Sequence, residues 1–223
     1  LSNFDGVFKY FPKQGYQVIA PELPIYNSSL LNTNVKFFAK FVYKFIKFKN
    51  LKDVIILGNS LGGHVGLIFS KLYPKLIKGL VLTGSSGLYE NSMGDSYPKR
   101  EDYNYIKERT EAVFFDPKIA TKKIVDEVYE TVNDRKKLIK ILAMAKSAIR
   151  HNMSNDLPNI LAETAIIWGE NDSVTPPEVA DEFKKLLPNS QLFWIENCGH
   201  APMMEHPEKF NSVMNSWLKE KKL

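Results

Sequence analysis

The segment VIILGNSLGGHVGL, residues 54–67, limits the possible folds of this chain more than any other stretch. An apolar, β-favouring run passes through a glycine-rich turn directly into a helical pattern, which predicts a buried strand, a tight turn and a helix. Ser60 stands in that turn between Gly58 and Gly62. Such a turn projects the hydroxyl from the sheet edge at a helix N-terminus and needs small residues two before and two after the serine, while Gly63 lets the helix approach closely. A glycine-rich turn that serves packing alone is the simpler alternative.

Short apolar runs alternate with helical patterns along most of the chain. Continuous apolar strands separated by helices are typical of a parallel sheet that is covered on both faces. The sequence therefore predicts the α/β class, with a mostly parallel sheet and helices on both faces. The strands are expected at 15–21, 53–59, 78–84, 164–170 and 191–197, and the helices at about 34–49, 61–73, 177–187 and 207–221.

Residues 87–157 interrupt this alternation. They begin with a loop-like segment, continue into helical patterns and carry no strand signal, and Pro158 closes them. We interpret them as a helical lid, inserted into a core that is formed by residues 1–86 and 158–223. The helical patterns fall at about 103–115, 121–132 and 134–150.

Length and composition are those of an ordinary globular protein. The chain has 223 residues, of which 44% are hydrophobic, and no apolar run is long enough to span a membrane. The single cysteine, Cys198, cannot form an internal disulfide and fits a reducing compartment. We therefore expect a cytoplasmic protein.

The positive charge of the chain is concentrated near its start. The net charge is +5, and residues 1–86 hold 11 Lys and Arg against 3 Asp and Glu. In residues 35–50 the lysines recur at helical spacing opposite a face of Phe, Val and Ile, which indicates an amphipathic surface helix with a solvated lysine face. An anion-binding or nucleic-acid-binding face is the alternative, but no aromatic residue interleaves with the lysines, so we expect no nucleic-acid partner. These lysines are Lys36, Lys40, Lys44 and Lys47.

A serine hydroxyl becomes a strong nucleophile only when a base takes its proton, so Ser60 calls for a histidine elsewhere in the chain. His200, in ENCGHAP, directly follows the last expected strand, where catalytic groups gather in open α/β sheets. The other histidines fit less well. His64 lies one turn into the helix after the serine and points away, His151 lies in the insertion, and His206 stands at a helix start as a surface or capping residue.

The carboxylate that orients such a histidine should also follow a strand. In WGENDSVTPP, Asp172 lies just beyond the strand expected at 164–170, in a turn that can hold its carboxylate toward His200. Glu170 is the alternative, but it directly abuts the strand end and its longer side chain would have to fold back. The candidates then occur in the order Ser60, Asp172, His200.

With these residues the chain resembles the α/β-hydrolase superfamily, in particular its lidded esterase and haloperoxidase-like branch. The resemblance implies a serine hydrolase that cleaves an ester or thioester of a small, mostly apolar substrate through an acyl-enzyme, with no metal and no organic cofactor. It also implies that Ser60 attacks, His200 transfers the proton, Asp172 stabilises the imidazolium and the Leu61 backbone N–H donates to the oxyanion. The matching segments are GYQVIAPELP, GNSLGGH, WGENDSVTPP, LPNSQLFWIENCGHAPMMEHPEKFN and the closing helix.

Two other functions remain open at this stage. The first is hydrolysis of a carbon–carbon bond in ring-cleavage products, because GNSxGG also occurs in such members of the superfamily. Those members tend to carry Trp after the catalytic histidine, where this chain has Ala201. The second is a non-catalytic receptor for a small molecule on the same fold.

The resemblance also leads to an expectation about the sheet. Members of the superfamily supply a second oxyanion donor from a His-Gly motif after an earlier strand, and no such motif occurs in the 223 residues. That earlier strand lies between the ones that correspond to 15–21 and 53–59. We therefore expect a further strand at this position and roughly 20 to 35 residues upstream of Leu1. Direct pairing of 15–21 with 53–59 would contradict this expectation.

Overall fold

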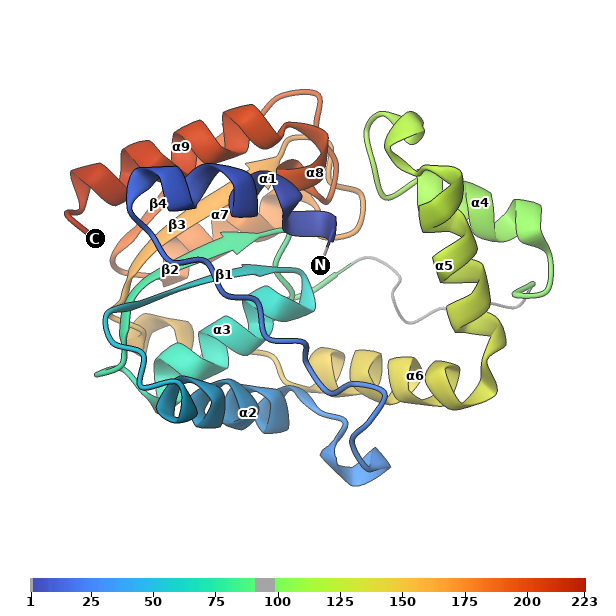
Figure 1. Ribbon diagram of the computed structural model, residues 1–223, viewed down its shortest axis with the longest axis horizontal. Coiled ribbons are helices and arrows are strands. Elements are labelled where there is room, and N and C mark those ends of the chain that lie inside the picture. The colour runs from blue at the N-terminus through green and yellow to red at the C-terminus, as the bar shows by residue number, and fades with distance from the viewer. Residues whose placement is uncertain (1, 91–98) are drawn as a thin grey trace.

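Four parallel strands form one sheet in a computed structural model that describes residues 2–90 and 99–223 (Figure 1). Their order in the sheet is the same as their order in the chain, so every connection is a crossover. The expected α/β class is confirmed, and four of the expected strands are present within two residues of their expected ends. The strands are β1 (Val54–Asn59), β2 (Ile77–Thr83), β3 (Glu163–Gly169) and β4 (Ser190–Ile195).

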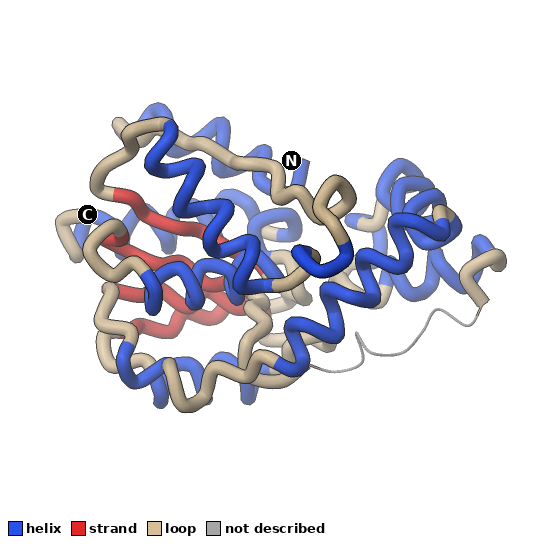
Figure 2. Tube along the Cα trace, turned by 90° about the horizontal axis from the view of Figure 1, so that it is seen from below, coloured by secondary structure: helices blue, strands red, loops and turns tan. Residues whose placement is uncertain are grey.

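Helices cover both faces of the sheet, as Figures 1 and 2 show from two directions. The helices expected at 34–49, 61–73, 177–187 and 207–221 are confirmed, whereas two short helices, α1 and α8, were not expected. One face is covered by α2 (Val35–Phe48), α3 (Leu61–Leu72) and α7 (Pro177–Leu186), and the other by α1 (Asp5–Tyr10), α8 (Pro202–Glu205) and α9 (Pro207–Glu220).

The strands build two cores because their side chains alternate between the two faces of the sheet. On the α3 side, Leu82 and Trp168 are fully buried among helical side chains such as Phe69. On the α9 side, Val81 packs in a separate cluster with Trp217. This two-sided burial explains the continuous apolar runs inside the strands, at 80–82 in β2 and 165–168 in β3.

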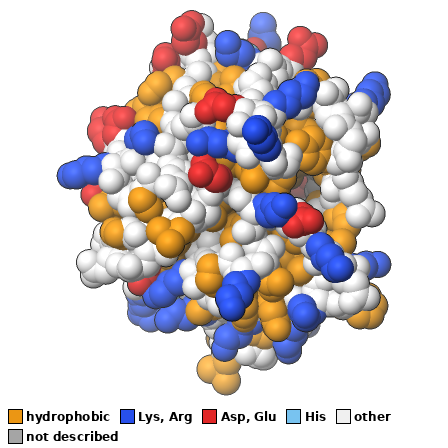
Figure 3. Space-filling view, turned by 90° about the vertical axis from the view of Figure 1, so that its left-hand side faces the viewer, with side chains coloured by type: hydrophobic (Ala, Val, Ile, Leu, Met, Phe, Trp, Pro, Cys, Tyr) orange, Lys and Arg blue, Asp and Glu red, His pale blue; other side chains and the backbone are white. Residues whose placement is uncertain are grey.

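The helix α2 has the amphipathic character that the sequence predicts. It begins after Asn34, whose side chain accepts a hydrogen bond from the Phe37 N–H and so caps the helix. Phe38 and Ile46 are buried, while the four lysines of this helix are exposed. Figure 3 shows Lys and Arg side chains along the lower part of the surface, the side of α2 in Figure 1, with hydrophobic side chains between them.

The insertion forms helices at the positions that the sequence predicts. Each begins at a residue whose side chain accepts hydrogen bonds from backbone N–H groups: Asp102, Thr121 and Asp134. In Figure 1, α4 and α5 project from one side of the sheet layers and α6 leads back to them. The division into a core and a lid stays a prediction. The helices are α4 (Tyr103–Glu111), α5 (Lys122–Asn133) and α6 (Arg135–Arg150).

The prediction of a strand at 15–21 is wrong. This segment is extended, but residues 17–22 form no backbone hydrogen bond with any described residue. A strand exists only as a hydrogen-bonded member of a sheet, and a groove of about 530 Å³ separates this segment from β1. Val18 and Ala20 line the groove on one side, and Ile55 and Leu57 of β1 line it on the other.

Consequently β1 is paired on one side only, with β2. Its residues are mostly half-buried, whereas those of β2 and β3 are mostly buried. The direct pairing of 15–21 with β1 that would contradict a further strand is not present in the described residues, and that strand stays a prediction. Among the helices described, none is both long and apolar enough to cross a membrane.

Candidate active site

Ser60 occupies the sharp turn between β1 and α3. Its backbone has φ 50° and ψ −119°, a conformation that residues other than glycine rarely adopt. Three hydrogen bonds hold it there: the Ser60 N–H donates to the Thr83 carbonyl (3.1 Å), and the Ser60 carbonyl accepts from the N–H groups of His64 and Ser86 (3.2 Å each). The turn is therefore held both by the helix that follows it and by the neighbouring strand.

Two of the three glycines around Ser60 are required by contact. A Cβ on Gly58 would lie 2.3 Å from the carbonyl carbon of Gly62, and a Cβ on Gly63 would lie 2.3 Å from the Ser85 Oγ. A Cβ on Gly62 would meet no atom within 4 Å. The expectation that the turn needs a small residue at 62 is therefore wrong, because it is the backbone at 62, and not its side-chain position, that faces Gly58.

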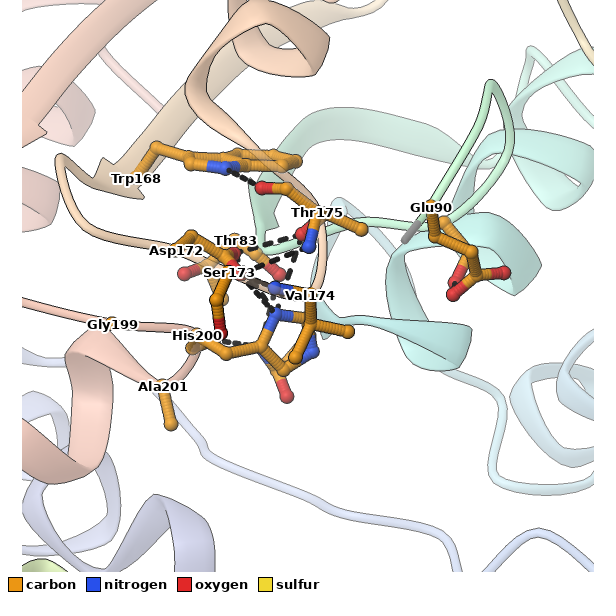
Figure 4. A network of polar contacts seen from close by, with 12 residues as sticks. Thr83, Glu90, Trp168, Asp172, Ser173, Val174, Thr175, Gly199, His200 and Ala201 are labelled. Atoms are coloured by element: carbon orange, nitrogen blue, oxygen red, sulfur yellow. Dashed lines mark hydrogen bonds and ion pairs between the residues drawn. The ribbon is translucent and has the colours of Figure 1, made fainter. Parts of the chain in front are cut away.

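The structure brings Asp172 and His200 into direct contact. The His200 Nδ1 lies 2.9 Å from one carboxylate oxygen of Asp172 and 3.1 Å from the other. Both residues are buried, with exposed fractions of 2% and 7%. Figure 4 shows that the turn after β3 surrounds the carboxylate. The Asp172 carboxylate accepts hydrogen bonds from the Val174 N–H (2.9 Å), the Thr175 N–H (2.9 Å) and the Thr175 hydroxyl (2.8 Å).

A buried carboxylate with this many donors is suited to hold a histidine in one orientation. Glu170, the alternative acid, is exposed, and no hydrogen bond or ion pair joins its side chain to His200 among the described residues. Of the two candidates, only Asp172 contacts His200 among the described residues.

Asn59, the last residue of β1, joins the loop of His200 to the strand that precedes Ser60. Its Nδ2 donates to the carbonyl oxygens of Thr83 and His200, at 3.0 Å each. Gly84, with φ 48°, lets the ring approach the end of β2, because a Cβ there would lie 2.8 Å from the His200 Nδ1. The three predicted residues thus lie at the carboxyl ends of β1, β3 and β4, on the same edge of the sheet.

Leu61 is the first residue of α3. The first N–H groups of a helix have no partner inside the helix and carry its positive dipole end. No acceptor for the Leu61 N–H occurs in the part of the chain that the structure describes. This N–H is therefore available to an acceptor, and its role toward an oxyanion stays a prediction.

The insertion and α8 also hold the loop of His200. The His200 N–H donates to the Val113 carbonyl, after α4, at 3.0 Å. Glu205 of α8 accepts from the N–H groups of Gly199 (2.9 Å), Ala201 (3.3 Å) and Phe115 (2.7 Å). One carboxylate therefore ties both neighbours of His200 to the insertion.

Sequence reasoning missed these supporting residues. The spacing of Asp172 and Thr175, three residues apart in a turn, is a signal for a side chain that caps a backbone turn. The bonds made by Asn59 and Glu205 join segments that are distant in sequence or lie in an unexpected short helix, so no local pattern reveals them.

The buried Cys198 lies outside this arrangement. Burial and the nearby Glu205 carboxylate raise the pKa of the Cys198 thiol, which keeps it protonated and unreactive.

No hydrogen bond joins the side chains of the other histidines to Asp172 or His200 among the described residues. Burial lowers the pKa of His64 to about 3, and the His64 Nε2 lies 3.2 Å from the Nδ1 of His151 at the end of α6. His206 directs its Nε2 to the Asn197 carbonyl and does not cap α9 with its side chain.

Ser60 lies in a strained turn between a strand and a helix, and a buried Asp172–His200 pair lies at the same edge of the parallel sheet. These features together are typical of hydrolases with an α/β fold. The family described as alpha/beta hydrolase fold matches residues 1–207. The chain belongs to this family.

Relatives of known structure share this fold along the whole chain. An alpha/beta hydrolase from the metagenome of lagoon sediments at Mar Chica, Morocco, is 52% identical, with a TM-score of 0.82, over 100% of this chain and 87% of that one. A variant of the meta-cleavage product hydrolase CumD has a TM-score of 0.84 at 19% identity, over 98% of this chain and 85% of that one. The second likeness shows the fold alone.

Curated relatives are more distant and differ in the reactions for which they are named. The 2-hydroxy-6-oxononadienedioate/2-hydroxy-6-oxononatrienedioate hydrolase of Comamonas testosteroni is 25% identical over 97% of this chain and 82% of its own length. Lipase 1 of Psychrobacter immobilis is 24% identical over 86% of this chain and 65% of its own length.

Proposed function

We propose that the protein is a serine hydrolase that cleaves an ester or thioester of a small, mostly apolar substrate through an acyl-enzyme. The observation that supports this most is the buried Asp172–His200 pair on the sheet edge where the strained turn presents Ser60. A nucleophile, a base and a group that orients the base are the minimum set for this chemistry.

In this mechanism the contact with Asp172 holds the proton of neutral His200 on Nδ1 and leaves Nε2 free as the base. The Ser60 oxygen attacks the acyl carbon while His200 takes the hydroxyl proton, and the Leu61 N–H donates to the oxygen that becomes negative. His200 then returns the proton to the leaving alcohol or thiol. Water attacks the acyl-enzyme by the same sequence, which releases the acid and restores Ser60.

Hydrolysis of a carbon–carbon bond is the second candidate. It is favoured by the Comamonas testosteroni relative, which is named for hydrolysis of such ring-cleavage products. The same serine, histidine and aspartate could serve both reactions, so the distinction depends on substrate tests.

The test is a panel of 4-nitrophenyl esters and acyl thioesters of increasing chain length, together with one ring-cleavage product. We expect the wild-type protein to turn over short or medium acyl esters and Ser60→Ala to lose about 10³-fold or more in kcat. Ser216→Ala, which changes an exposed serine of α9, is the matched control and should keep full activity.

Ester turnover that survives in Ser60→Ala would contradict the proposal. Turnover of the ring-cleavage product alone would favour the second candidate. Tight binding of a panel compound without any turnover would favour a receptor.

A further inference from the structure

The carboxyl group of Glu90 lies close to the turn of Ser60 and has no part in the proposed mechanism. Glu90 lies in the loop that follows β2, the strand beside β1. Its Oε2 accepts a hydrogen bond from the hydroxyl of buried Ser86 at 3.2 Å. The N–H of the same serine donates to the Ser60 carbonyl at 3.2 Å. Two hydrogen bonds therefore connect Glu90 to the turn of Ser60.

Glu90 is also within electrostatic reach of the proposed base. Burial raises the pKa of its carboxyl group, while the Ser86 hydroxyl and the nearby His200 lower it. Figure 4 shows Glu90 on a different loop from the hydrogen-bond network around Asp172. Besides Asp172, which touches the His200 ring, the carboxyl group of Glu90 thus interacts electrostatically with it.

Within residues 2–90 and 99–223, no Lys or Arg side chain forms an ion pair or hydrogen bond with Glu90, Asp172 or His200. A partly buried carboxylate without a basic partner among the described residues, such as that of Glu90, makes the potential around it negative. A negatively charged substrate group that enters this region loses hydration and gains no opposite charge.

We propose that Glu90 is a specificity-determining residue, whose carboxylate disfavours acyl chains that end in a carboxylate and so selects neutral ones. This proposal rests on the proposed ester hydrolysis and narrows its substrate class. The Comamonas testosteroni relative is named for a dioate, a substrate class with two carboxylates. Selection by Glu90 would direct this chain to other substrates.

The test compares two esters with the same leaving group and acyl chains of five carbons, 4-nitrophenyl pentanoate and mono-4-nitrophenyl glutarate. They differ in the terminal carboxylate of the glutarate. At pH 8, we expect Glu90→Gln to raise the ratio of kcat/KM for the glutarate to kcat/KM for the pentanoate about tenfold, equivalent to about 1.4 kcal/mol. Glu90→Asp keeps the charge and should keep the wild-type ratio.

Glu196→Gln is the matched control, because it removes an exposed carboxylate that follows β4 at the same edge of the sheet. Its ratio of the two kcat/KM values should equal that of the wild type. Added NaCl should raise kcat/KM for the glutarate in the wild type and do so less in Glu90→Gln, because salt screens the repulsion. Thermal unfolding of each variant checks that it is folded.

Normal turnover of the pentanoate with an unchanged ratio in Glu90→Gln would overturn the role of Glu90 and leave the proposed function intact. A ratio that changes as much in Glu196→Gln would also overturn it. Failure of the wild type to turn over either ester would overturn the proposed function and this proposal with it.

Discussion

Thr175 supports the candidate site in a way that is separable from the chemistry. Its hydroxyl donates to Asp172 at 2.8 Å and lies 3.3 Å from the His200 Nδ1, while its backbone N–H binds the same carboxylate. The hydrogen bond from the Thr175 N–H does not depend on the side chain. A substitution of Thr175 therefore tests the contribution of its hydroxyl group alone. In the proposed mechanism Thr175 is a positioning residue, which acts through Asp172 and His200.

We expect Thr175→Val, which replaces the hydroxyl by a methyl group, to lower kcat about tenfold with little change in KM, because a hydrogen bond to a charged group contributes about 1.5–3 kcal/mol. The matched control is Ser173→Ala, two residues away, whose hydroxyl binds the Ala112 carbonyl and not the Asp172–His200 pair. Steady-state kinetics on one ester measures both. Equal losses in the two variants, or a change confined to KM, would contradict the positioning role.

The turn between β1 and α3 is the element on which the site depends most. It holds Ser60 at positive φ, and the close packing of Gly58 against the backbone of Gly62 leaves no room for a Cβ. The five-residue span 58–62 therefore contains one glycine that the packing requires, Gly58, and one whose added Cβ would meet no atom, Gly62. This difference makes the turn testable by two matched substitutions.

We expect Gly58→Ala to lower the free energy of unfolding by about 3 kcal/mol or more, because a Cβ at 2.3 Å from backbone atoms forces the turn to move. Gly62→Ala adds the same methyl group in open space at the start of α3 and should change the free energy by less than about 1 kcal/mol. Urea unfolding measures both. A Gly62→Ala loss as large as that of Gly58→Ala would show that the turn is packed differently.

The contact between His64 and His151 joins α3 to the end of α6 and makes stability depend on pH. In the folded protein burial lowers the pKa of His64 from 6.5 to about 3. Between these values the unfolded chain binds a proton that the folded protein excludes. The contribution is therefore complete above pH 6.5 and is lost as the pH falls toward 3.

On this basis, the free energy of unfolding should fall between pH 7 and pH 5, with a contribution from His64 of the order of 2 kcal/mol. His64→Gln removes the titrating group and should flatten this slope, whereas His206→Gln changes a histidine outside the pair and should keep it. Urea unfolding at several pH values measures the slopes. An unchanged slope in His64→Gln would contradict burial of a neutral ring at this position.

The positions of the strands β1 to β4 could be predicted from the sequence because coverage of both faces of the sheet requires apolar runs. The positions of the longer helices could be predicted from the helical spacing of their apolar residues. The prediction of a strand failed at 15–21, because an apolar run shows that a segment is buried beside a sheet but not that it has a hydrogen-bonded neighbour. The helices α1 and α8 span only six and four residues, too few to show a helical period.

The candidate site was predictable for a different reason. Each of Ser60, Asp172 and His200 follows the end of an apolar strand within five residues, and parallel strands bring such ends to one edge. The supporting contacts were only partly predictable. The spacing of Asp172 and Thr175 is a local signal, whereas Asn59 and Glu205 contact segments far away in the chain that only folding brings near.

In the whole molecule, the open side of β1 is the least protected part of the sheet. The amide groups of β1 that point away from β2 face the groove and have no partner among the described residues. In the 223-residue chain, hydrogen exchange measured by mass spectrometry should therefore be faster for β1 than for β2 and β3, which are paired on both sides. Equal protection of β1 and β2 would show that this edge is covered.

The proposed function requires that the fold presents Ser60 as an activated nucleophile. A fluorophosphonate probe tests this most directly, because it reacts covalently with a serine only where a base and an oxyanion donor activate the hydroxyl. Peptide mass spectrometry after labelling should find one modified residue, Ser60, with no label in Ser60→Ala and strongly reduced labelling in His200→Ala. Labelling that persists in folded Ser60→Ala, or a folded wild-type protein that takes up no label, would contradict the account.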